Sequence, residues 1–187
     1  IGMKAKIWMG HLRNFYKANG YPKDDQLPQF TEMCYGSPYR EIHYCCIETV
    51  QRRLKHQSQD FIDTLKWMVV TNSWWDSVDW LAGLIGAHLK RFPQLQPLTT
   101  DSFNQSDNMW LIRVSIIFQL KYKDDVDFEK LTTYILNHVD SHEFFIRKAQ
   151  GWALRQYSKF QPELVRDFVE AHPELSGLTK REASKYL

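Results

Sequence analysis

The chain has 187 residues, of which 43% are hydrophobic and 25% are charged, so it is long enough to form one domain with a sizeable core. It contains only eight glycines and seven prolines, which leaves little turn chemistry for an all-β fold. The formal net charge is +2, so any attraction to a polyanion must come from the local placement of charge. Three cysteines without zinc-finger spacing indicate reduced thiols, a cytoplasmic location and no metal site. The longest apolar stretch, Trp80 to Ala87, is too short to span a membrane.

Helix boundaries and apolar spacing predict an all-α chain. Asn19-Gly20 predicts a helix end, whereas Ser37-Pro38 and Gln161-Pro162 predict helix starts. Between such boundaries, apolar residues recur at intervals of three and four, which is typical of amphipathic helices. The segments with this spacing are Tyr39 to Leu54, Phe61 to Val70, Trp74 to Leu89, Asp107 to Leu120, Phe128 to Val139, Phe144 to Tyr157 and Leu164 to Val169.

An internal repeat indicates how these helices are arranged. The segment that begins at Trp110 matches the segment that begins at Phe144, an offset of 34 residues, and aligns Ile112-Arg113 with Ile146-Arg147. The same offset backwards aligns Val78-Asp79 with Ile112-Arg113. Repeats of this length are typical of stacked helical pairs, so we expect a curved α-helical superhelix with Asp79, Arg113 and Arg147 on one face. An ordinary helical bundle is the alternative.

The segment from Asn72 to Trp80 combines three tryptophans with two carboxylates. Ser73 is a plausible N-cap, which would place Trp75 and Asp79 one turn apart on the same helix face. A carboxylate beside an indole ring suits a cationic or electron-poor ligand. The alternative interpretation is that the tryptophans belong to the core and the carboxylates are solvated.

A second candidate feature is a stripe along the helix expected from Phe144. Lys148, Trp152, Arg155 and Lys159 follow one another at intervals of four, three and four. Basic side chains can bind phosphates while an aromatic ring packs on a sugar or base, so the stripe favours a nucleic-acid groove. A solvated basic face, with Trp152 packed against the next helix, is the alternative. No glycine-rich phosphate loop occurs, so no nucleotide cofactor is expected.

Four stretches resemble the AlkD-type DNA alkylation-repair glycosylases, a family built of HEAT-like helical repeats. They are Val70 to Trp80, Ser106 to Lys123, Glu143 to Lys159 and Leu178 to Leu187, with a looser match before Val70. The resemblance implies an all-α fold: a single HEAT-like repeat domain over residues 1–187, wound as a right-handed superhelix and lacking the family's native N-terminal helix and C-terminal end. The chain departs from the family's Thr-Pro helix start, since it reads Gly2-Met3-Lys4 there.

The resemblance also implies a function and a site. The expected protein is a monomeric, monofunctional glycosylase of base excision repair that hydrolyses the N-glycosidic bond of cationic N3- or N7-alkylated purines in duplex DNA, without cofactor or metal. In the implied catalytic set, Asp79 stabilises the oxocarbenium ion, Trp75 and Trp152 hold the sugar, and Arg113 holds the phosphate. The residues expected to bind the DNA backbone are Lys121, Arg147, Lys148, Arg155 and Lys159. A HEAT-like protein scaffold and a nucleic-acid binder without chemistry are the competing hypotheses.

Overall fold

The computed structural model describes residues 2–187, and over this range it contains helices and no strand. The α-helices are α1 (Ala5–Asn19), α2 (Leu27–Tyr35), α3 (Arg40–Arg53), α4 (Phe61–Val70), α5 (Trp75–Arg91), α6 (Gln96–Asn104), α7 (Met109–Ile117), α8 (Phe128–Leu136), α9 (Phe144–Tyr157), α10 (Pro162–Ala171) and α11 (Gly177–Ala183). The predicted all-α fold is confirmed. No helix in this range is long and apolar enough to cross a membrane.

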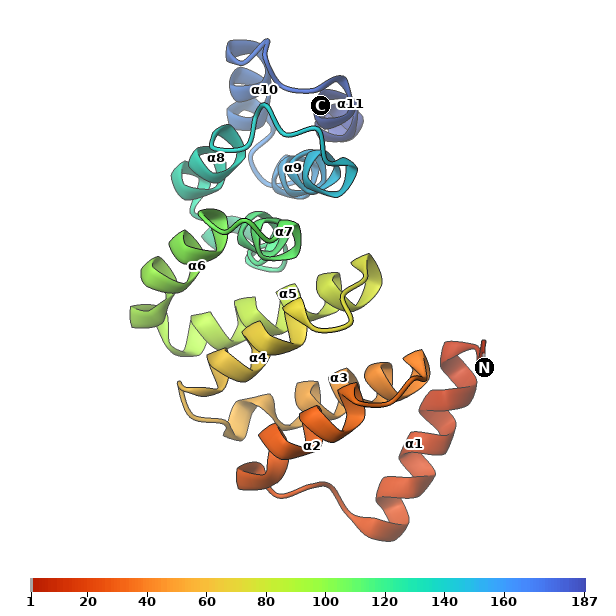
Figure 1. The fold of residues 1–187 in the computed structure, drawn as a ribbon. Coiled ribbons are helices and arrows are strands. Elements are labelled where there is room, and N and C mark those ends of the chain that lie inside the picture. The colour runs from red at the N-terminus through yellow and green to blue at the C-terminus, as the bar shows by residue number, and fades with distance from the viewer. Residues whose placement is uncertain (1) are drawn as a thin grey trace.

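The helices after α1 form a curved stack of antiparallel pairs (Figure 1). Helices α3, α5, α7 and α9 make one row, in which each helix contacts the next, and α11 packs on α9 at the end of the row. Helices α2, α4 and α6 each contact the following member of that row, and the stacked rings of Phe128 and Tyr157, 5.0 Å apart, join α8 to α9. The stack is a helical-repeat architecture and excludes the ordinary bundle.

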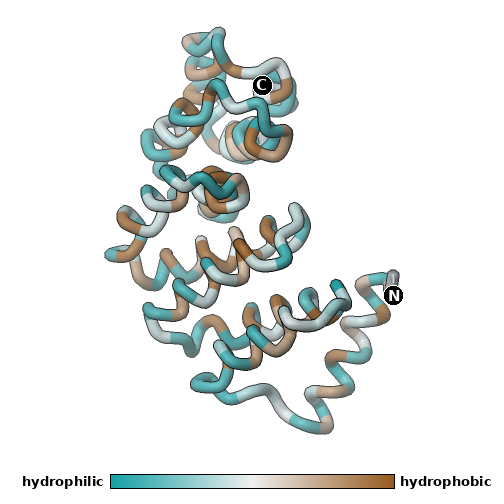
Figure 2. Tube along the Cα trace, in the orientation of Figure 1, coloured by the Kyte–Doolittle hydropathy of each residue, from teal (hydrophilic) through white to brown (hydrophobic). Residues whose placement is uncertain are grey.

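The 34-residue repeat seen in the sequence corresponds to equivalent core positions. Val78, Ile112 and Ile146 lie on α5, α7 and α9 and are all buried. Hydrophobic residues recur along these three helices (Figure 2), because each helix is covered by its pair partner and by the neighbouring helices of the row. The residue after each of these core positions is therefore held at a similar place in successive repeats.

Helices α5 and α7 approach closely because Gly86 carries no side chain. A Cβ atom at Gly86 would lie 2.1 Å from the carbonyl oxygen of Phe118, which is far inside van der Waals contact. The Tyr122 hydroxyl donates to the Gly86 carbonyl at 2.8 Å and closes the same contact. This close packing sets the separation between the side chains that α5 and α7 present to the candidate site.

Two of the three predicted helix boundaries are confirmed. Helix α1 ends at Asn19 and is followed by Gly20 with a φ of 74°, and α10 begins at Pro162. The start predicted at Ser37-Pro38 is wrong by two residues, since α3 begins at Arg40. There the Ser37 hydroxyl accepts from the Tyr39 N–H, so it orders the turn before the helix instead of capping it.

Candidate functional site

Residues from α5, α7 and α9 surround an open pocket of about 340 Å³. All four predicted catalytic residues line it, together with two of the five predicted DNA-binding residues and two adjacent phenylalanines. The lining residues are Trp75, Asp79, Arg113, Phe144, Phe145, Lys148, Trp152 and Arg155. The pocket therefore combines one carboxylate, three cations and four aromatic rings.

Asp79 and Arg113, which both line this pocket, form a bidentate ion pair. Arg113 Nε donates to Asp79 Oδ1 at 2.7 Å, and Nη2 donates to Oδ2 at 2.9 Å. The third hydrogen bond of Arg113 runs from Nη1 to the Phe145 carbonyl at 2.5 Å. The Arg113 side chain is 3% exposed and that of Asp79 is 15% exposed. The guanidinium thus fixes the carboxylate, and the expected phosphate contact of Arg113 stays a prediction.

The first turn of α5 places Trp75 and Asp79 on one face, as expected, but through a different cap. Trp74 is the N-cap residue and makes no side-chain cap bond. The expectation that Ser73 caps the helix is wrong, because its hydroxyl donates to the Val69 carbonyl at the end of α4 instead. Trp75 is 46% exposed, so its ring is available to a ligand in the pocket.

The other residues of the Trp-rich segment do not line the pocket, and each has partners elsewhere in the chain. The Trp74 ring contacts Trp110 and Phe145, with centroids 6.4 and 5.9 Å apart. Trp80 Nε1 donates to Gln51 Oε1. Asp76 accepts from Arg40 and from the Tyr44 hydroxyl. Structural roles therefore account for these residues, whereas Trp75 and Asp79 line the pocket.

The basic stripe on α9 is divided by the structure. Lys148, Trp152 and Arg155 line the pocket, whereas Lys159 is exposed beyond it, with its Nζ 5.1 Å from the centre of the Tyr186 ring. Trp152 is half-buried. Its side chain thus borders the pocket while part of it packs against neighbouring residues.

The remaining predicted DNA-binding residues, Arg147 and Lys121, lie outside the pocket. Arg147 donates to the Ser141 carbonyl at 2.6 Å and to His142 Nδ1 at 2.7 Å, so it ties α9 to the preceding loop. Lys121 is exposed and crosses to α5, where a Cβ atom at Gly83 would lie 3.3 Å from its Nζ. Contacts of these two residues with DNA stay predictions.

Sequence reasoning did not single out Phe144, Phe145 and Glu182. The two phenylalanines begin α9, where Phe144 is 57% exposed and Phe145 is half-buried, so two adjacent aromatic residues at a predicted helix start were the available signal. Glu182 lies on α11 and accepts from Lys148 at 2.8 Å and from Arg155 at 2.7 Å. No local pattern marks this glutamate, because the contact joins α9 to α11 and α10 lies between them in the sequence.

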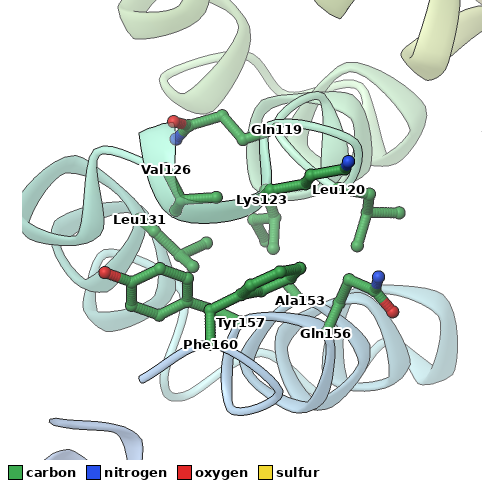
Figure 3. Close-up of a pocket in the computed structure, with 10 residues that line it drawn as sticks. Gln119, Leu120, Lys123, Val126, Leu131, Ala153, Gln156, Tyr157 and Phe160 are labelled. Carbon is green, nitrogen blue, oxygen red and sulfur yellow. The ribbon is translucent and has the colours of Figure 1, made fainter.

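A second hollow lies between the end of α7 and helix α9 (Figure 3). Its lining is mostly apolar and includes Leu120, Val126, Leu131 and Phe160. Its volume is only about 10 Å³, which is room for about one water molecule. No group of three metal-ligating side chains occurs in the part of the chain that the structure describes. The pocket around Asp79 is therefore the better candidate for a functional site.

The fold and the site define a helical-repeat protein with an aromatic, ion-paired pocket formed by successive repeats. Residues 2–187 match the family model described as DNA alkylation repair enzyme, so the chain belongs to that family. None of the curated proteins compared with the chain matches it.

Three solved structures share the fold. One, described as a predicted DNA alkylation repair enzyme from Enterococcus faecalis, is 32% identical with a TM-score of 0.91, over 100% of this chain and 87% of that one. AlkD2 from Streptococcus mutans is 17% identical with a TM-score of 0.72, over 100% and 92%. The protein smu.31 from Streptococcus mutans UA159 is 18% identical with a TM-score of 0.70, over 97% and 92%. At such identities the two streptococcal structures show the fold alone, and the family assignment rests on the family model and the enterococcal protein.

Proposed function

We propose that this protein is a monofunctional DNA glycosylase that releases cationic N3- or N7-alkylated purines from duplex DNA. The observation that carries the proposal is an open pocket whose lining combines the Asp79 carboxylate with two tryptophans, Trp75 and Trp152, and with three cations. Family membership supports a role in the repair of alkylated DNA.

The substrate chemistry explains why one carboxylate is enough. An alkylated purine is already cationic, so it leaves without a proton from a general acid. As the C1′–N bond breaks, its electron pair neutralises the base and positive charge develops on the deoxyribose. Asp79 stabilises this charge and orients a water molecule, whose oxygen bonds to C1′ while its proton passes to solvent.

The aromatic rings complete the site for a cationic sugar. An indole face attracts a cation by about 0.5–2 kcal/mol, more when water is excluded. Trp75 contributes an exposed ring from α5, and Trp152 contributes a half-buried ring from α9. An open pocket of this kind suits a nucleotide that stays largely within the duplex, in contrast to the enclosing pockets of base-flipping enzymes.

Arg113 contributes by orienting Asp79. Because its guanidinium is nearly buried and bonded to both carboxylate oxygens, it keeps the carboxylate in one orientation throughout the reaction. Besides Arg113, the cations that can contact phosphates are Lys148 and Arg155 at the pocket and Lys159 beyond it.

One lysine, Lys148, lines the pocket. Its Nζ is bound to Glu182 Oε1 at 2.8 Å, so it is held as a cation partner and not as a free amine nucleophile. The proposal remains that the enzyme leaves an abasic site and does not cut the strand.

Base release decides the proposal. A duplex that carries N7-methylguanine or N3-methyladenine is incubated with the protein, and the free base is measured by chromatography. We expect free methylated base, and strand breaks only after alkali treatment. Salt-dependent DNA binding without base release would identify a non-catalytic binder, and the absence of both would favour a protein scaffold. We also infer that the protein is cytoplasmic and acts as a monomer without cofactor or metal. Sedimentation of the protein alone and on DNA would test the monomeric state.

A further inference from the structure

Glu182 is a buried carboxylate that holds three cations. It is 6% exposed, on the last turn of α11. Its Oε1 accepts from Lys148 Nζ at 2.8 Å and from Lys185 Nζ at 2.7 Å, and its Oε2 accepts from Arg155 Nη1 at 2.7 Å. Both oxygens of one carboxylate are thus committed to cations.

The position of this carboxylate is fixed by close packing between α9 and α11. A Cβ atom at Gly151 would lie 2.5 Å from the Glu182 Cβ and 2.7 Å from the Thr179 carbonyl oxygen, so the two helices meet where α9 has no side chain. The Thr179 hydroxyl bonds to Gln150 Oε1 at 2.9 Å beside this contact. Glu182 therefore projects from a well-packed backbone and has little freedom to move.

The three cations differ in their relation to the candidate site. Lys148 and Arg155 line the pocket, and both lie on the same α9 face as Trp152. Lys185 does not line the pocket, and its side chain is 49% exposed. A free lysine or arginine side chain loses conformational entropy when it is ordered. A carboxylate that holds the two pocket cations in advance removes much of that loss.

We propose that Glu182 is a positioning residue that aims Lys148 and Arg155 at the phosphates on either side of the nucleotide bound at Asp79. The inference rests on the proposed glycosylase function and deepens it. Three cations around one carboxylate leave a net local charge of +2, so the cluster still attracts phosphate after the ion pairs have formed.

The test compares Glu182→Gln with Lys185→Gln, which removes a charge of opposite sign from the same cluster but outside the pocket. Excision is measured in single turnover at saturating alkylated DNA, and affinity is measured separately on undamaged duplex. For Glu182→Gln we expect excision about tenfold slower, because the cations lose their fixed geometry. Its affinity for undamaged duplex should rise, because a negative charge has been removed. Lys185→Gln should excise within about twofold of the unmodified protein.

A slower excision rate together with a higher DNA affinity in Glu182→Gln distinguishes positioning from a merely structural role. Loss of a structural role would lower the rate, the affinity and the melting temperature together. Unchanged excision in Glu182→Gln, or an equal loss in Lys185→Gln, would overturn the inference. If Glu182→Gln does not fold, Glu182→Asp retains the charge and retracts it by one methylene group, and the same slowing with unchanged affinity is expected. If the unmodified protein releases no base, the proposed function fails, and an unaltered affinity of Glu182→Gln for undamaged duplex then counts against the positioning role on its own.

Discussion

Arg113 and Asp79, 34 residues apart, bind each other through two parallel hydrogen bonds of 2.7 and 2.9 Å. The pair joins equivalent positions of two successive repeats, so the stacking of α5 on α7 brings the carboxylate and the guanidinium together directly. Because Arg113 is also bonded to the Phe145 carbonyl on α9, three repeats meet at one guanidinium. A change in any of these helices is expected to move the carboxylate.

Asp79→Asn should abolish most base release while DNA binding remains. The amide retains the shape and one acceptor for Arg113 but loses the charge that meets the oxocarbenium ion, so single-turnover excision should fall about a hundredfold to a thousandfold. Asp76→Asn is the matched control on the same helix. Asp76 bonds to Arg40 and Tyr44 outside the pocket, so this variant should lose thermal stability and retain its excision rate. Full excision by Asp79→Asn would contradict the assignment.

Trp75→Ala should slow excision about tenfold, the equivalent of 1.4 kcal/mol of cation–π stabilisation. Because the Trp75 ring is 46% exposed, the melting temperature should change little. The variant Trp80→Ala on the same helix removes a half-buried ring and its hydrogen bond to Gln51 outside the pocket, and it should show the reverse pattern, with lower stability and near-normal excision. A large loss of stability in Trp75→Ala would instead support a core role. Trp152→Ala should lower both quantities, since its ring is half-buried.

Arg113→Lys should lower both stability and activity. A lysine cannot bind both oxygens of Asp79 and the Phe145 carbonyl at once, so the carboxylate loses its fixed orientation. The lysine retains the positive charge, so the loss of stability should be smaller than the about 3 kcal/mol that removal of one partner of a buried ion pair costs. Chemical denaturation and single-turnover excision measure the two effects. Normal excision in a folded Arg113→Lys variant would show that the orientation of Asp79 does not limit catalysis.

The double variant Arg155→Gln with Lys159→Gln tests the basic stripe. Each cation that contacts a phosphate contributes a slope of about 0.9 in log affinity against log salt, so the double change should flatten the slope by nearly two units. Affinity should fall by a similar factor for undamaged and alkylated duplexes, because phosphate contacts carry no base information. Arg166→Gln on α10, which pairs with Glu163, is the matched control and should leave the slope unaltered. An unaltered slope in the double variant would identify the stripe as a solvated face.

Acid should weaken the contact between α9 and α11. Hydrogen bonds from Lys148 and Lys185 lower the pKa of Glu182 to about 2. Since the folded pKa lies below the unfolded value of about 4.3, the stabilisation is fully present above that value and is lost as pH falls toward 2. Melting temperatures of the native protein and of Glu182→Gln, measured between about pH 5 and pH 2, should therefore converge as the pH falls. A constant difference across that range would mean that Glu182 does not titrate there.

The sequence by itself determined the architecture and the identity of the central residues. Apolar spacing of three and four marked α4 and α9 with correct bounds, because each buries one face over several turns. The match between Ile112-Arg113 and Ile146-Arg147 indicated the repeat, since stacked repeats place equivalent residues in equivalent environments. Helices such as α6 and α11 were not predicted, because they are short and largely polar.

Only the tertiary structure decided which partner each charged side chain has. The spacing of Lys148 and Arg155 was visible along α9, but their common acceptor Glu182 is supplied by α11, 27 residues beyond Arg155. In the same way, the sequence showed a single arginine in α7, whereas only the fold showed that its guanidinium pairs with Asp79. Periodicity is a property of one helix, whereas ion pairs between helices depend on how closely the helices pack. Here Gly86 and Gly151 allow close packing because neither has a Cβ atom.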